Sequence, residues 1–197
     1  MSVLILVVVL GLAAFWLIGA YNSLISLKNQ VANAWKQIDV QLKRRHDLIP
    51  NLVETVKGAM QFERDTLDAV ITARNQAINV ERGSASVAQT AQAESALSSA
   101  LSRLLVVVEA YPDLKATGNV AQLQEELTST ENKITFARQL YNDTATLYNT
   151  KQAQFPTNMV AGMASAMPVE LWEITDAAER AVPKIDLTMK QPDRARV

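Results

Sequence analysis

An uninterrupted apolar run at the start of the chain limits the possible folds more than any other feature. Residues 3–20 read VLILVVVLGLAAFWLIGA and contain no charged side chain. A helix of about 20 residues, rising about 1.5 Å per residue, crosses a hydrocarbon core about 30 Å thick. Trp16 and Tyr21 lie near the end of the run, where aromatic rings favour the membrane–water interface. The run therefore predicts a short N-terminus and a transmembrane anchor over residues 1–21.

A cleaved signal peptide is the competing interpretation of this run. Ile18, Gly19 and Ala20 form an acceptable cleavage site, but no basic segment precedes the apolar part, as it does in signal peptides. We therefore favour a retained anchor. Basic side chains follow the run and none precedes it, and such flanks are kept in the cytoplasm. The basic side chains that follow the run are Lys28, Lys36, Lys43, Arg44 and Arg45. We therefore expect the N-terminus outside and the rest of the chain in the cytoplasm.

Composition excludes several classes of protein. The chain has no cysteine, which rules out disulfides, thiolate metal sites and thiol catalysis. Its formal net charge is −1, so no overall field draws it to nucleic acid. With only six glycines and six prolines in 197 residues, the chain is rich in good helix formers. This composition favours an all-α protein.

Apolar spacing after the anchor predicts an antiparallel, coiled-coil-like bundle of three long helices over residues 22–156. The first runs from residue 22 to about 80, the second from a cap at Ser84 to about 111, and the third from a cap at Asn119. The third helix repeats every seven residues, which favours a buried seam and left-handed supercoiling. Its predicted seam consists of Val120, Leu127, Ile134, Tyr141, Tyr148 and Phe155.

The C-terminal part has a different composition. Residues 157–190 form a Met-rich segment and a short helix expected at about 168–181, and residues 191–197 are expected to fray. Met159, Met163 and Met167 suit packing better than a copper site, because no His or Cys accompanies them. We expect this segment either to pack between copies of the chain or to lie on lipid.

A charged stretch at residues 39–54, DVQLKRRHDLIPNLVE, has three interpretations. Catalysis is disfavoured, because His46 and Asp47 are neighbours and point about 100° apart on a helix. Nucleic-acid binding would need a wider basic face. We favour a structural joint in which Arg44 and Arg45 are hydrated or paired, and Pro50 bends a continuous helix by leaving the His46 carbonyl unbonded. The joint also includes Asp47, and the acidic candidates for pairing are Asp39 in the same helix and Glu125, Glu126 or Glu131 in another.

The same stretch resembles the signature of the LemA family of bacterial membrane proteins. The resemblance is carried by IDVQLKRR at residues 38–45 and DLIPNLVETVKG at 47–58, and also by LLVVVEAYPDLK at 104–115 and LQEEL at 123–127. It extends from the anchor to about residue 163, with His46 standing where Tyr is usual. The family implies an N-terminal membrane span followed by an antiparallel helical bundle, and brings no established activity or cofactor. We therefore expect a single-pass protein of the bacterial inner (cytoplasmic) membrane.

The interpretation with the best support is a non-enzymatic, membrane-anchored scaffold that self-associates through helical faces and organises the membrane. An adaptor that recruits a membrane protease or a sensor kinase is the alternative. A hydrolase fits less well, because the sequence indicates no nucleophile, base or set of metal ligands. We expect the lipid bilayer and further copies of the chain as partners, with no nucleic acid, cofactor or metal.

Overall fold

The computed structural model describes residues 1–60, 62–83, 85–115 and 118–173. Most of the predicted short C-terminal helix and the tail at 191–197 lie outside the described residues. All regular structure within them is helical, which confirms the predicted all-α fold. The helices, in chain order, are α1 (Ser2–Lys57), α2 (Arg64–Arg82), α3 (Val87–Glu109), α4 (Pro112–Lys115), α5 (Gly118–Ala153) and α6 (Asn158–Ala161).

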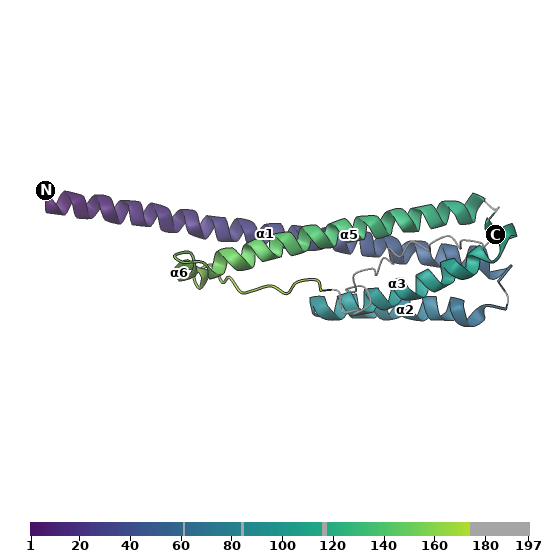
Figure 1. The fold of residues 1–197 in the computed structure, drawn as a ribbon. Helices are drawn as coiled ribbons and strands as arrows, with labels where there is room; N and C mark the ends of the chain where they lie inside the picture. The colour runs from purple at the N-terminus through teal and green to yellow at the C-terminus, as the bar shows by residue number, and fades with distance from the viewer. Residues whose placement is uncertain (61, 84, 116–117, 174–197) are drawn as a thin grey trace, which may run out of the picture.

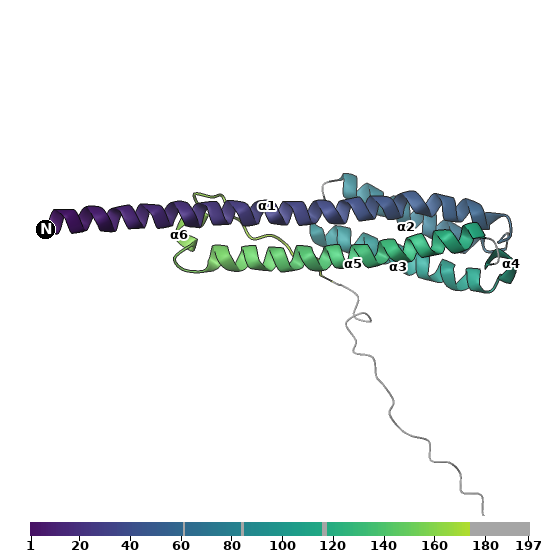
Figure 2. The ribbon, with the colours of Figure 1, turned by 90° about the horizontal axis from the view of Figure 1, so that it is seen from above.

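Two antiparallel helix pairs make up the fold. α1 and α5 lie side by side along most of α5, while α2 and α3 form a shorter hairpin on the half of α1 farther from the N-terminus (Figures 1 and 2). α1 has 56 residues, so it is about 84 Å long. Its first part projects beyond the other helices, and the large apolar side chains of residues 3–18 are exposed. Such an apolar, uncovered helix indicates membrane anchoring.

The structure divides the predicted helix of residues 22–80 into two. α1 continues through Pro50, as predicted, but ends at Lys57, and the chain returns in the opposite direction as α2 from Arg64. Met60 is fully buried in this turn, between the apolar faces of the two helices. Spacing alone did not reveal the reversal, because Val56 and Leu67 face the same core from opposite directions. Gly58, the one glycine between residues 22 and 80, was the available signal.

Two further boundaries differ from the sequence predictions. Ser86, not Ser84, caps α3: its hydroxyl accepts from the backbone N–H of Gln89 at 3.2 Å, and the Gln89 side chain accepts from the Ser86 N–H at 3.0 Å. Residues 166–173 are extended, which corrects the predicted start of a helix at about 168. Their main chain is instead bonded to side chains of α5, as described below.

Two apolar clusters fill the interior. The distal cluster lies under the hairpin of α2 and α3 and includes Ile49, Leu52 and Leu104. The proximal cluster lies between α1 and α5 and includes Ile38 and Ile134. Fully burying one such side chain contributes about 1.5–3 kcal/mol. On α1, Arg45 and His46 of the charged stretch lie between Leu42, the last α1 residue of the proximal cluster, and Ile49, the first of the distal cluster.

Candidate functional site

A buried ion cluster occupies the place where α1, α3 and α5 meet. Arg45 and Glu94 are each 1% exposed and contact one another through Nη2 and Oε2. Arg45 Nη1 also donates to Glu131 Oε2 at 2.6 Å and to Ser98 Oγ at 2.9 Å. His46 Nε2 lies 2.9 Å from the second oxygen of Glu94. Both carboxylate oxygens of Glu94 are thus engaged by α1.

Glu94 is held in its charged form. Burial raises the pKa of this carboxyl, but the hydrogen bond from His46 and the charge of Arg45 outweigh burial and leave the pKa below its ordinary value. An ionised carboxylate only accepts hydrogen bonds, so the proton in the contact with His46 belongs to Nε2 of the imidazole. The cluster therefore pairs a buried anion with a buried cation, which an apolar core tolerates only with such hydrogen bonds.

Pro50 creates a second contact beside this cluster. Proline has no N–H, so the carbonyl of His46 lacks its helical donor. Arg74 of α2 supplies one, since its Nε donates to that carbonyl at 2.7 Å. Glu81 Oε2 lies 3.8 Å from His46 Nδ1. Partial burial, followed by the nearby charge of Glu81, raises the pKa of Asp39. The free carbonyl left by Pro50 is thus a point of attachment for α2.

The other residues of the predicted joint stay near solvent. Arg44 is half-exposed, with Nη2 3.8 Å from Glu126 Oε2, and Asp47 pairs with Lys43 at 3.1 Å on the surface. Glu94 was not among the expected partners. Its signal in the sequence was a carboxylate at an apolar heptad position of the second predicted helix, between Thr90 and Leu97.

The ion cluster has the character of a structural connection. At 1% exposure, Arg45 and Glu94 are closed to a substrate in solution. Within the described part of the chain, no group of three or more His, Asp or Glu side chains is placed to hold a metal ion. Chemically, the arrangement can join three helices and titrate in acid.

A second organised region is the extended segment 166–173, here called the strap. Asn149 of α5 bonds the strap twice, donating to the Val169 carbonyl at 2.8 Å and accepting from the Val169 N–H at 2.9 Å. Asn142 makes the same pair of bonds with Trp172, at 2.9 and 2.8 Å. The seven-residue step from Asn142 to Asn149 rises about 10.5 Å along the helix, and the three-residue step from Val169 to Trp172 covers about 10 Å in an extended chain. The two asparagines are therefore spaced to bond the strap at both positions.

Trp172 fills an aromatic socket at the end of the strap. Its ring centroid lies 5.9 Å from that of Trp35, which meets Tyr141 edge-on at 5.2 Å. The Arg138 guanidinium lies 4.7 Å over the Trp172 ring, a cation–π contact. The Tyr141 hydroxyl donates to the Glu170 carbonyl at 2.7 Å, and burial followed by the nearby Glu170 charge raises the pKa of Tyr141.

The strap also reaches the other helix pair. The carboxylate of Glu170 accepts a hydrogen bond of 3.1 Å from the backbone N–H of Val87, the first residue of α3. A negative charge is favourable at this end of a helix. The strap thus links α5, α1 and α3 through one extended stretch.

The predicted seam and interface residues are placed as follows. Phe155 lies beyond the end of α5 and is 80% exposed, so it is outside the seam. Trp16 and Tyr21 are partly exposed on α1, on either side of Ala20, where burial begins. The remaining seam positions are buried: Val120, Leu127, Ile134, Tyr141 and Tyr148.

Comparison with known proteins agrees with this architecture. The LemA family profile matches residues 34–187. The chain belongs to the LemA family. Protein LemA of Metamycoplasma hominis is 27% identical over 174 residues, which cover 88% of this chain and 78% of that protein. Magnetosome protein MamQ 2 of Paramagnetospirillum magneticum is 21% identical over 203 residues, covering 91% and 75%. MamQ of Magnetospirillum gryphiswaldense is 21% identical over 198 residues, covering 88% and 73%.

Membership of the LemA family confirms the resemblance inferred from the charged stretch. The matched region begins at residue 34, beyond the exposed apolar part of α1, and includes the ion cluster and the strap. The family and these relatives support a membrane-associated helical protein of non-catalytic type.

This LemA-family chain also carries an exposed apolar surface away from its core. Val40 of α1 and Phe136, Leu140 and Leu147 of α5 are 44–71% exposed; we call them the outer apolar face. Val40, Phe136 and Leu140 line one shallow groove between the two helices, together with Lys36 and Lys133 among others. Contact surfaces of proteins commonly consist of large apolar side chains gathered in this way.

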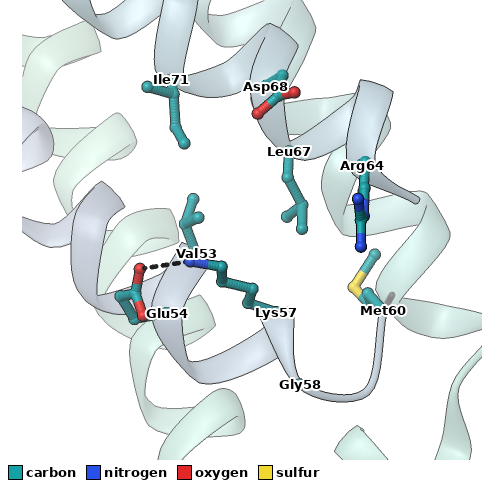
Figure 3. A pocket seen from close by; sticks show the side chains of 9 residues that line it. All are labelled: Val53, Glu54, Lys57, Gly58, Met60, Arg64, Leu67, Asp68 and Ile71. Atoms are coloured by element: carbon teal, nitrogen blue, oxygen red, sulfur yellow. Dashed lines mark hydrogen bonds and ion pairs between the residues drawn. The ribbon is translucent and has the colours of Figure 1, made fainter. Parts of the chain in front are cut away.

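A hollow of about 620 Å³ opens at the turn between α1 and α2 (Figure 3). Its apolar part includes Val53 and Leu67, while charged side chains of both signs stand around it. Lys57 Nζ lies 3.4 Å from Glu54 Oε1, an exposed ion pair. The charges of the lining are balanced, and it holds no nucleophile and no imidazole. This lining suits packing around a turn.

Proposed function

We propose that this LemA-family protein is a non-enzymatic scaffold, anchored in the membrane by the first part of α1, that self-associates through the outer apolar face. The exposure of that face carries the proposal. Its four side chains lie on the pair of α1 and α5, which extends from the anchor, and they remain 44–71% exposed in the single chain. Burying such apolar area is the main driving force of protein association.

A second copy of the chain is the proposed occupant of this face. α1 is one helix from Ser2 to Lys57, so the anchor and Val40 belong to the same rod. Copies anchored in one bilayer therefore stand in the same orientation and present Phe136 at the same height. Equal height lets identical faces of neighbouring copies meet, as closed symmetric assemblies require.

The proposed scaffold lies on the cytoplasmic side of the bacterial inner membrane. Basic residues follow the apolar segment and none precedes it, which favours this orientation. A reporter fused after Val197 is expected to be active in the cytoplasm. Activity confined to the opposite side of the membrane would reverse the proposed topology.

Self-association is tested by the size of the purified, detergent-solubilised full chain. Phe136→Glu places a charge in the outer apolar face and is expected to reduce the assembly to smaller species. Thr135→Glu adds the same charge one position round α5 and is expected to leave the size unchanged. Circular dichroism checks that both variants are folded. A wild-type chain that is monomeric, or equal sizes for all three proteins, would overturn the proposal.

The same purification separates the scaffold from the adaptor interpretation. A scaffold is recovered as multiples of its own mass. An adaptor would be recovered with a stoichiometric foreign membrane protein, which Phe136→Glu would release without changing any self-association.

A further inference from the structure

The connector between α5 and the strap, residues 154–165, exposes large apolar side chains on one side. Phe155, Met159 and Met163 are spaced by four residues and are 80%, 69% and 75% exposed. Val160 and Ala164 point the other way and are buried. The connector is therefore two-sided, with one side packed on the bundle and one side uncovered.

The connector lies beside the end of the predicted transmembrane segment. A hollow there is lined by Phe15, Trp16 and Gly19 of α1 and by Thr157 of the connector, among others. Lys28 Nζ donates to the carbonyl of Ser165 at 3.3 Å. Figures 1 and 2 both show α6 at the end of the bundle nearest the N-terminus, alongside α1.

The height of the connector can be compared with the thickness of a bilayer. Residues 3–20 are all needed to cross a hydrocarbon core about 30 Å thick. Phe15 lies about 7 Å inside the end of that segment at Ala20, given about 1.5 Å per residue. Interfacial segments bury their apolar side about 5–10 Å into the boundary between headgroups and acyl chains. The part of the connector at Thr157, beside Phe15 and Gly19, thus stands at the depth of that boundary.

Charge agrees with this placement. No charged residue occurs between Lys151 and Glu170, so the whole connector is neutral. Lys28 and Lys151 stand next to it, and lysine side chains can place their ammonium groups among lipid phosphates while their stems stay apolar. Met side chains are flexible and adapt to an irregular surface such as acyl chains.

We propose that Phe155, Met159 and Met163 insert into the phospholipid leaflet that borders the bundle, as a second membrane contact beside the anchor. The occupant of the exposed side of the connector is the lipid surface. Two contacts at the same end of the molecule fix the direction in which the bundle leaves the membrane, which a single helix does not. This inference rests on the anchor of the proposed function, and it is independent of self-association.

Single-cysteine labelling tests the proposal, because the chain has no cysteine of its own. Met163→Cys in the full chain carries a polarity-sensitive fluorophore, and the chain is reconstituted in liposomes of phosphatidylcholine and phosphatidylglycerol. We expect quenching by nitroxides attached to the upper acyl chain, and several-fold less quenching by aqueous iodide than at Val106→Cys. Val106 is the matched control, being an apolar side chain 68% exposed on α3, in the half of the bundle away from the anchor.

Leu10→Cys reports separately on the anchor. Lipid quenching at Leu10 with iodide access at Met163 equal to that at Val106 would overturn the connector inference alone. Iodide access at Leu10 as well would overturn the anchored scaffold with it. Met159→Cys repeats the measurement on the same side of the connector, so the result does not depend on one labelled variant.

Discussion

Arg45→Met is expected to destabilise the bundle by about 3–5 kcal/mol, the cost of removing one partner from a buried ion pair. Methionine fills much of the same space with an unbranched side chain but carries no charge. Glu94 stays buried, with only His46 as a hydrogen-bond partner from the ion cluster. Folded domains have a total margin of about 5–15 kcal/mol, so this loss is a large part of it.

Two further variants show whether the buried charge is the cause. Arg44→Met removes a half-exposed arginine 3.8 Å from Glu126, and such surface pairs contribute about 0–1 kcal/mol. The double variant Arg45→Met with Glu94→Leu removes both buried charges and is expected to recover most of the lost stability, since apolar replacements of buried pairs are often neutral or stabilising. Glu131 keeps contact with water in that variant, because its side chain is 41% exposed.

The measurement is urea unfolding of the full chain in detergent, followed by far-ultraviolet circular dichroism. Equal unfolding midpoints for Arg45→Met and Arg44→Met would show that the stability of the fold does not depend on the buried arginine. A double variant no more stable than Arg45→Met would show that the unpaired Glu94 charge is not the source of the loss.

Three other perturbations give distinct results. The pKa of Glu94 is lowered in the folded state, so the ionised carboxylate stabilises the fold at pH values above its ordinary pKa. This contribution is lost as the pH falls through the folded-state pKa. The difference in melting temperature between the wild type and Glu94→Gln should therefore become smaller in acid. Ile134→Asp buries an unpaired carboxylate in the seam and should cost several kcal/mol by thermal melting, whereas the exposed Thr135→Asp should be mild; equal tolerance would mean that the seam is not packed. Asn142→Ala removes two hydrogen bonds to the strap, which together contribute about 1–3 kcal/mol. Amide hydrogen exchange of residues 166–173 should become faster in this variant. An exchange rate equal to that of the exposed control Gln139→Ala would mean that Asn142 does not hold the strap.

Regular spacing within single helices could be interpreted from the sequence because it depends on local geometry. The steps of seven along α5 identify one side of a helix wherever that helix packs, and Ile134 and Tyr141 are indeed buried. Phe155 continues the same spacing, but it lies after Ala153, the last residue of α5, so the seven-residue repeat extends beyond the end of the helix. A pattern alone does not show where its helix ends.

The turn after α1 shows the same limit. An apolar period continues unchanged when two antiparallel helices turn their apolar sides to one core, as Val56 and Leu67 do through Met60. Only Gly58 marked the break, and a single glycine within a helical pattern is tolerated often enough to be ambiguous.

The sequence by itself determined an apolar anchor, an all-α body and the free carbonyl at Pro50, because each follows from residues within a few positions of one another. Only the tertiary structure decided that Glu94 would receive Arg45 and His46, which lie 49 and 48 residues away along the chain. It also decided that residues 166–173 would be extended. Asn142 and Asn149 bind the strap main chain at a spacing that an extended segment matches, and these bonds replace those of the helix that local composition favoured.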